Sequence, residues 1–154
     1  MANFDYLRRY VSRESPPTRN WFMPVSEDEI RAAEQRMGMS FPDALRQFYL
    51  EVGSGFLRAT EGEKRVTANV NRILDPAEAA ALRLGEVEGS APLEGFEEGD
   101  VPVFEVGDQL FLVMRPSTAK PDAVYWMYGE QVAPTFEDFV RRMYFEDPDY
   151  FKET

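Results

Sequence analysis

The chain has 154 residues, with 28 acidic and 17 basic side chains and neither histidine nor cysteine, so its formal net charge is −11. These counts exclude disulfides, thiolate nucleophiles, imidazole bases and metal sites with cysteine or histidine ligands. One domain is expected at this length, and a hydrophobic fraction of 44% is typical of a globular protein. The acidic balance disfavours direct binding to nucleic acid and favours a cationic partner or simple solubility.

The sequence carries few indications of the cellular compartment in which the protein works. The longest strongly apolar run, Leu110 to Met114, is far shorter than the roughly 20 residues of a membrane-spanning helix. The N-terminus lacks the apolar core of a signal peptide, and the absence of cysteine fits a reducing compartment. We therefore expect a soluble protein that works in the cytoplasm without contacting a membrane.

Helical patterns open the chain. Asn3 to Ser12 has apolar residues at helical spacing, with Asn3 as a candidate N-cap. An apolar stretch, Trp21 to Pro24, leads into the next helix. There, Ser26 and Glu29 have the spacing of a capping box, and Gly38 is placed to end the helix in a left-handed conformation.

A second helix is predicted to begin at Pro42. It carries apolar residues at positions i, i+3, i+4 and i+7, which form one core-facing stripe: Leu45, Phe48, Tyr49 and Val52. The glycines of residues 53–55 stop it. The following stretch is less clear, with residues 56–60 and 65–71 as candidate strands on either side of a turn.

The second half changes from helical to strand-like periodicity. A short helix is expected from Asp75, its cap, to Gly85, followed by an irregular loop over residues 86–100. Three strands follow, Val101–Val106, Gln109–Met114 and Ala123–Tyr128, and Gly107-Asp108 is the predicted hairpin turn between the first two.

A last helix is expected to start at Thr135, and its core stripe consists of Phe136, Phe139, Val140 and Met143. The tail, residues 146–154, has no assignable pattern. Helices, then strands, then a closing helix predict a single α+β domain with a mostly antiparallel sheet. The aromatic residues of the strands, together with Trp21, are expected mainly in the core, although an exposed aromatic patch would suit recognition.

No catalytic constellation is visible. The glycines near residue 54 lack the lysine and the spacing of a phosphate-binding loop, and residues 75–86 lack the alternating oxygen ligands of a calcium loop. Neighbouring glutamates such as Glu97 and Glu98 do not by themselves make a catalytic carboxylate pair. We therefore expect no enzyme activity, no catalytic residues, no cofactor and no metal.

One segment holds most of the excess charge. Residues 86–108 contain eight acids and no basic residue, which accounts for −8 of the −11. The acids are Glu86, Glu88, Glu94, Glu97, Glu98, Asp100, Glu105 and Asp108. Three interpretations stay open: a solvated, self-repelling loop, a docking surface for a basic protein, and a mimic of nucleic-acid phosphates.

The motifs together resemble the SUKH superfamily, which includes the yeast cell-wall synthesis regulator group and many bacterial immunity proteins. Its usual opening is matched in order by Trp21, Pro24–Ile30, Glu34, Met37–Gly38, Phe41–Pro42, Leu45, Phe48–Tyr49 and Gly53–Gly55. Its central hairpin, next strand and closing helix are similar to Val101–Phe104, Gly107-Asp108, Leu110, Leu112, Val124–Trp126 and Thr135–Val140. Met37 and Phe41 replace the usual leucines and keep an apolar side chain. The resemblance runs over residues 21–144 of a single domain of residues 1–154.

The resemblance implies a binding module without catalytic residues. In bacteria such proteins commonly neutralise a cognate toxin, often a nuclease, by docking on it. A toxin that acts on nucleic acid tends to be basic where it binds phosphate, so we expect contacts from the acidic segment, at Glu94, Glu97, Glu98 and Asp100. The alternatives are an intracellular regulatory or scaffold module of the same family, and an acidic decoy that mimics nucleic acid.

Overall fold

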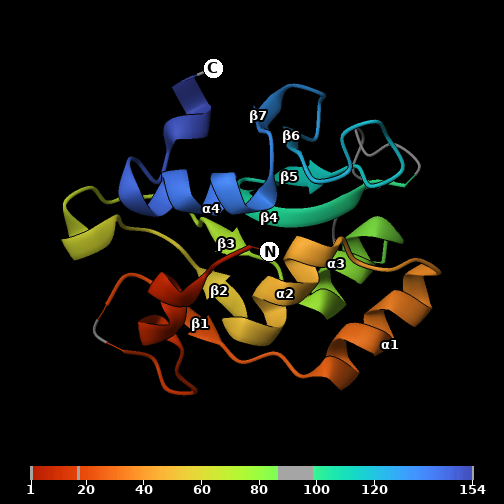
Figure 1. The fold of residues 1–154 in the computed structure, drawn as a ribbon, viewed down its shortest axis with the longest axis horizontal. Coiled ribbons are helices and arrows are strands. Elements are labelled where there is room, and N and C mark those ends of the chain that lie inside the picture. Colours follow the sequence, from red (N-terminus) through yellow and green to blue (C-terminus); the bar gives the residue numbers. More distant parts are fainter. Residues whose placement is uncertain (1, 17, 87–98, 154) are drawn as a thin grey trace.

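An antiparallel sheet organises the chain. The computed structural model describes residues 2–16, 18–86 and 99–153, and within these ranges the strands form one seven-stranded sheet whose spatial order follows the chain, from β1 to β7 (Figure 1). The strands are β1 (Trp21–Met23), β2 (Ser54–Phe56), β3 (Arg72–Ile73), β4 (Val101–Gly107), β5 (Leu110–Met114), β6 (Val124–Trp126) and β7 (Gln131–Ala133). The predicted α+β class and antiparallel sheet are confirmed.

The helices come before, between and after the strands along the chain. They are α1 (Glu27–Met37), α2 (Asp43–Glu51), α3 (Pro76–Arg83) and α4 (Phe136–Phe145), with short 3₁₀ helices η1 (Asp5–Tyr10), η2 (Glu61–Glu63) and η3 (Tyr150–Glu153). Figure 1 shows α4 lying across the sheet, and α1, α2 and α3 gathered beside its β1–β3 end. None of the described helices is long and apolar enough to cross a bilayer.

Strand register sorts the side chains into two rows. One row crosses six strands, and its members are Phe22, Gly55, Ile73, Phe104, Leu112 and Trp126. Because opposed residues in a sheet share a face, this row faces one side, where Phe22 packs on Phe48 of α2 and Phe104 on Phe139 of α4. The other row is Trp21, Phe56, Arg72, Glu105 and Phe111.

The helix boundaries confirm the predicted caps. Ser26 and Glu29 form both hydrogen bonds of a capping box at the start of α1, and Gly38 ends that helix at φ 71°. The side chain of Asp75 caps α3 by accepting from the Glu78 amide, and the Thr135 hydroxyl caps α4. Each cap satisfies a backbone amide that the helix itself leaves unpaired.

The N-terminal third differs from the prediction in two places. The helix expected from Asn3 is a 3₁₀ helix over Asp5–Tyr10 with Phe4 at its N-cap. Trp21 to Met23 is the edge strand β1 rather than a lead-in to α1. The glycines after α2 explain that strand, because a Cβ on Gly53 would lie 1.9 Å from the Met23 carbonyl oxygen, so only glycine lets the two backbones approach.

Further parts of the sheet differ from the prediction. Residues 56–60 and 65–71 were expected to form strands, but the strands lie just outside these stretches, as β2 and β3. Within them, Ala59 and Val66 form one isolated bridge. A register shift in β4 moves the hairpin turn by one residue, to Asp108 and Gln109, both at positive φ, as a two-residue primed turn requires. Strand β7 was not foreseen.

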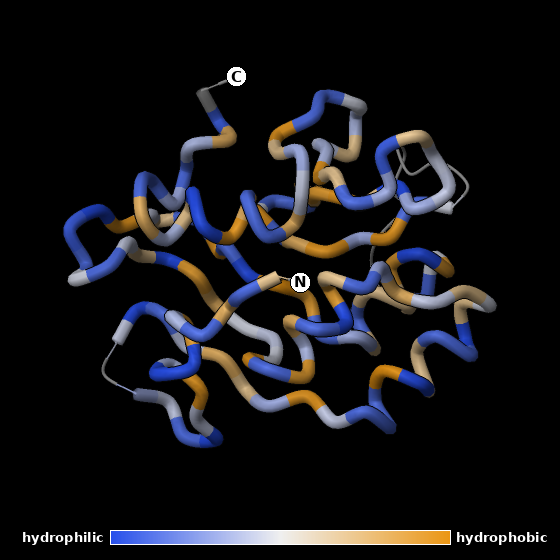
Figure 2. The backbone as a smooth tube through the Cα atoms, viewed as in Figure 1, coloured by the Kyte–Doolittle hydropathy of each residue, from blue (hydrophilic) through white to orange (hydrophobic). Residues whose placement is uncertain are grey.

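The unassigned tail belongs to the core. Phe151 is fully buried and packs on Phe104, Trp126 and Phe139. The amide of the buried Asn71 donates to the Pro148 carbonyl at 2.8 Å. Figure 2 shows hydrophobic stretches along the central strands, with hydrophilic loops around them.

Candidate partner-binding surface

Distant arginines neutralise part of the acidic segment. Four of its eight acids lie in the described residues, and three of these form ion pairs: Glu86 with Arg36 at 2.8 Å, Asp100 with Arg115 at 3.1 Å, and Glu105 with Arg72 at 2.7 Å. The arginines come from α1, the end of β5 and β3. The imbalance of −8, counted along the sequence, therefore leaves out three arginines that the fold brings to this segment, one of which, Arg72, is shared with Glu78.

The structure describes one of the four predicted contact residues, Asp100. Glu94, Glu97 and Glu98 lie outside the described residues. Asp100 is 2% exposed, and its carboxylate accepts a hydrogen bond from the Arg115 guanidinium. Its assignment as a partner contact stays a prediction, whereas the structure shows it in an internal ion pair.

Arg72 is shared by two carboxylates. Its guanidinium donates to both oxygens of Glu78, from α3, and to Glu105 from β4. These hydrogen bonds lower the pKa of Glu78, because they stabilise the charged carboxylate. The neighbouring Asp75 is partly buried, and desolvation raises its pKa. This cluster carries more negative than positive charge and lies at the edge of the sheet face that holds Trp21 and Phe56.

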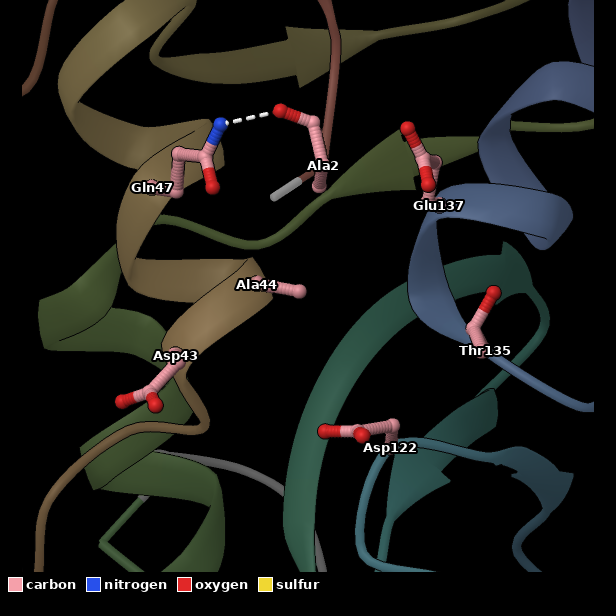
Figure 3. A pocket seen from close by; sticks show the side chains of 7 residues that line it. All are labelled: Ala2, Asp43, Ala44, Gln47, Asp122, Thr135 and Glu137. Carbon is pink, nitrogen blue, oxygen red and sulfur yellow. Dashed lines mark hydrogen bonds between the residues drawn. The ribbon is translucent and has the colours of Figure 1, made fainter.

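A cleft of about 540 Å³ opens between α2, α4 and the N-terminal segment (Figure 3). Its lining residues are Ala2, Asp43, Ala44, Gln47, Asp122, Thr135 and Glu137. Gln47 donates a hydrogen bond to the Ala2 carbonyl, and Glu137 accepts one from the Asn3 amide at 2.6 Å. These two bonds tie the N-terminal segment to both helices.

The cleft is negatively charged. Three of its lining side chains are carboxylates and none is basic. Asp43 and Glu137 lie in the first turns of α2 and α4, where a negative charge is favourable next to the helix dipole. Across the described ranges, no three acidic side chains converge closely enough to hold a metal ion. The charge of its lining favours a cationic group in the cleft.

Sequence reasoning missed the cleft. Its residues come from the N-terminal segment, from α2, from the turn before β6 and from α4, so no local motif marks it. The signal available in the sequence was an acid in the first turn of each of two helices, and such an acid is also the ordinary choice for helix stability. Only the packing of α2 beside α4, through Phe48 and Phe136, brings those two turns together.

The fold and these surfaces define a small α+β domain with negatively charged recesses. The chain belongs to the SMI1 / KNR4 family (SUKH-1), whose family model matches residues 24–142. This confirms the resemblance drawn from the motifs. The chain is also 30% identical over 136 residues to "Immunity protein YxxD" of Bacillus subtilis (strain 168), covering 85% of this chain and 88% of that protein. No solved structure matches it.

Proposed function

We propose that this protein is an immunity protein that binds and neutralises a cognate toxin by protein–protein docking. The observation that carries the proposal is the similarity to an immunity protein over 85% of the chain, within a family whose model matches most of it. The protein acts in the cytoplasm as a stoichiometric binder, not as an enzyme, because protection needs only that the toxin surface be covered.

The proposed partner has a basic docking surface. The net charge of −11 raises the encounter rate with a cationic protein and disfavours acidic ones. A nuclease is the proposed toxin class, since such enzymes present basic side chains to phosphate. The proposed docking contacts are Glu94, Glu97 and Glu98. Asp100, at the end of the same segment, would have to leave its ion pair with Arg115 to join them. The carboxylates of the cleft add to the negative potential that attracts a cationic partner.

The first experiment tests protection. The genes next to this one are searched for a toxin domain, which is then expressed from an inducible promoter, alone and together with this chain. We expect growth arrest without the chain and growth with it, and an equimolar complex on gel filtration. A toxin that still arrests growth when the chain is expressed in soluble form would contradict the proposal.

The second experiment tests the surface. The variant Glu97→Lys with Glu98→Lys changes the net charge by +4, and Glu14→Lys with Glu130→Lys makes the same change at two exposed acids elsewhere. Because opposed charges at an interface set affinity and registry, we expect the first variant to bind at least about 10-fold more weakly, and the control to bind nearly as wild type. Equal affinities for both would remove the acidic segment from the interface.

A further inference from the structure

A narrow groove lies on the sheet face that holds the second side-chain row. It is a recess of about 160 Å³, lined chiefly by Trp21, Met23, Phe56, Arg72 and Asp75, and is called here the β1–β3 groove. Helices α2 and α4 pack on the opposite face. Met23 remains 45% exposed in β1, and Trp21 and Phe56 are half-buried. The described part of the chain therefore leaves apolar surface open on this side.

The aromatic part of the groove is held in place. The rings of Trp21 and Phe56 stack with centroids 6.4 Å apart, and the Trp21 indole N–H donates to the Ser12 carbonyl at 2.8 Å. The Arg58 guanidinium lies 4.0 Å from the Phe56 centroid. A tryptophan whose polar atom is already satisfied offers its rigid ring to a partner at low entropic cost. The Arg58 guanidinium occupies one face of the Phe56 ring, so the Trp21 ring is the aromatic surface offered to a partner.

The other end of the groove is acidic. Asp75 lines it, and Arg72 next to it is already shared by Glu78 and Glu105. Asp75 adds a third carboxylate beside these two, and the Arg58 guanidinium is the second cation near the groove. The recess is smaller than the about 300–1,000 Å³ of small-molecule pockets, so its size fits a single long side chain rather than a metabolite.

We propose that the β1–β3 groove receives a lysine or arginine side chain of the partner toxin. The aliphatic stem packs on Trp21 and Met23, and the cationic head lies beside Asp75. Long basic side chains combine an apolar stem with a charged end in this way, and aromatic rings next to carboxylates attract such a head. The inference rests on the proposed immunity function and assigns to it a second contact, separate from Glu94, Glu97 and Glu98.

The test uses Met23→Lys, which places a competing cation in the groove at an exposed position. The matched control is Leu50→Lys, an equally exposed leucine on α2, 48% against 45%, and Met23→Leu keeps the groove apolar. Binding to the toxin domain that passes the co-expression test is measured by titration calorimetry. We expect Met23→Lys to weaken binding at least about 10-fold, with both other variants close to wild type.

A Met23→Lys affinity equal to that of the wild type would overturn the proposal. So would equal losses in Met23→Lys and Leu50→Lys, because the effect would then be one of net charge alone. Sedimentation of the free chain tests a different occupant: a wild-type dimer that Met23→Lys converts to monomer would assign the groove to a second copy. Failure of the proposed function itself is distinguishable, because the wild-type chain would then give no protection at all.

Discussion

The Arg115 Nε donates to the Asp100 carboxylate at 3.1 Å, although the two side chains are only 11% and 2% exposed. The same guanidinium lies 4.9 Å from the Tyr125 ring centroid. A buried ion pair contributes little compared with apolar packing, but removal of one member leaves an uncompensated charge inside the protein. Asp100 therefore holds the start of β4 in place through the end of β5.

Arg115→Met is expected to lower the free energy of unfolding by about 3–5 kcal/mol. The control is Arg31→Met, which breaks the exposed Arg31–Glu27 pair on α1 and should cost no more than about 1 kcal/mol. Urea denaturation followed by circular dichroism measures both values. If Arg115→Met lost no more stability than the control, the ion pair with Arg115 would not be what compensates the buried charge of Asp100.

Gly53→Ala should be among the most damaging single substitutions in the chain. Gly53 has φ +118°, and an added Cβ would lie 1.9 Å from the Met23 carbonyl oxygen, so β1 would have to move away. We expect a loss of about 4 kcal/mol. Gly38→Ala is the matched control, since Gly38 also has positive φ but no atom within 4 Å of the added Cβ, and it should cost about 1–2 kcal/mol. Thermal unfolding of the two proteins separates steric contact from backbone strain.

The burial of two tyrosines predicts that the free energy of unfolding falls at alkaline pH. Burial raises the pKa of Tyr49 and Tyr150 above 10.0, and their hydroxyls donate to the Leu74 and Val132 carbonyls. In the unfolded chain both ionise near pH 10. Their contribution to stability is therefore complete below pH 10 and decreases as the pH rises above it.

Urea midpoints measured between pH 8 and 11.5 test this dependence. Tyr49→Phe should be less stable near neutral pH, because it loses a hydrogen bond, yet its stability should decline less steeply above pH 10. Tyr128→Phe alters a side chain that is 69% exposed and should keep the wild-type slope. Identical slopes for all three proteins would contradict the assignment.

Loss of the capping box at the start of α1 should lower the free energy of unfolding by less than Gly53→Ala or Arg115→Met does. The Glu29 amide donates to the Ser26 hydroxyl at 3.1 Å, and the Glu29 carboxylate accepts from the Ser26 amide. Ser26→Ala removes the first of these bonds and should cost about 1 kcal/mol. Ser26→Asp keeps an acceptor at the cap and should remain close to wild type in a thermal melt; a loss equal to that of Ser26→Ala would argue against a capping role.

The sequence was sufficient for features that depend on local chemistry. The caps at Ser26, Asp75 and Thr135 and the stop at Gly38 each need only residues within one turn of helix, so their patterns were readable. Strand β1 was missed because its partner lies more than 30 residues away, and the glycines that admit it also explain the end of α2. The hairpin turn moved by one residue because the register shift in β4 has no sequence signature.

The candidate site was less predictable for the same reason. Charge counted along residues 86–108 ignored the arginines that the fold brings to Glu86, Asp100 and Glu105. The β1–β3 groove combines Trp21, Phe56 and Asp75 from three separate segments. Neither result follows from spacing, because both depend on which strands become neighbours.

The tail has a consequence for the order of events during synthesis. Phe151 and Pro148 are made after all the residues that they contact, including Phe104 and Asn71. Until residues 147–152 have been translated, the Asn71 amide lacks the Pro148 carbonyl and the aromatic cluster lacks one ring. A chain truncated before residue 147 would lack these contacts, so we expect it to be cleaved by proteases more readily than the full chain.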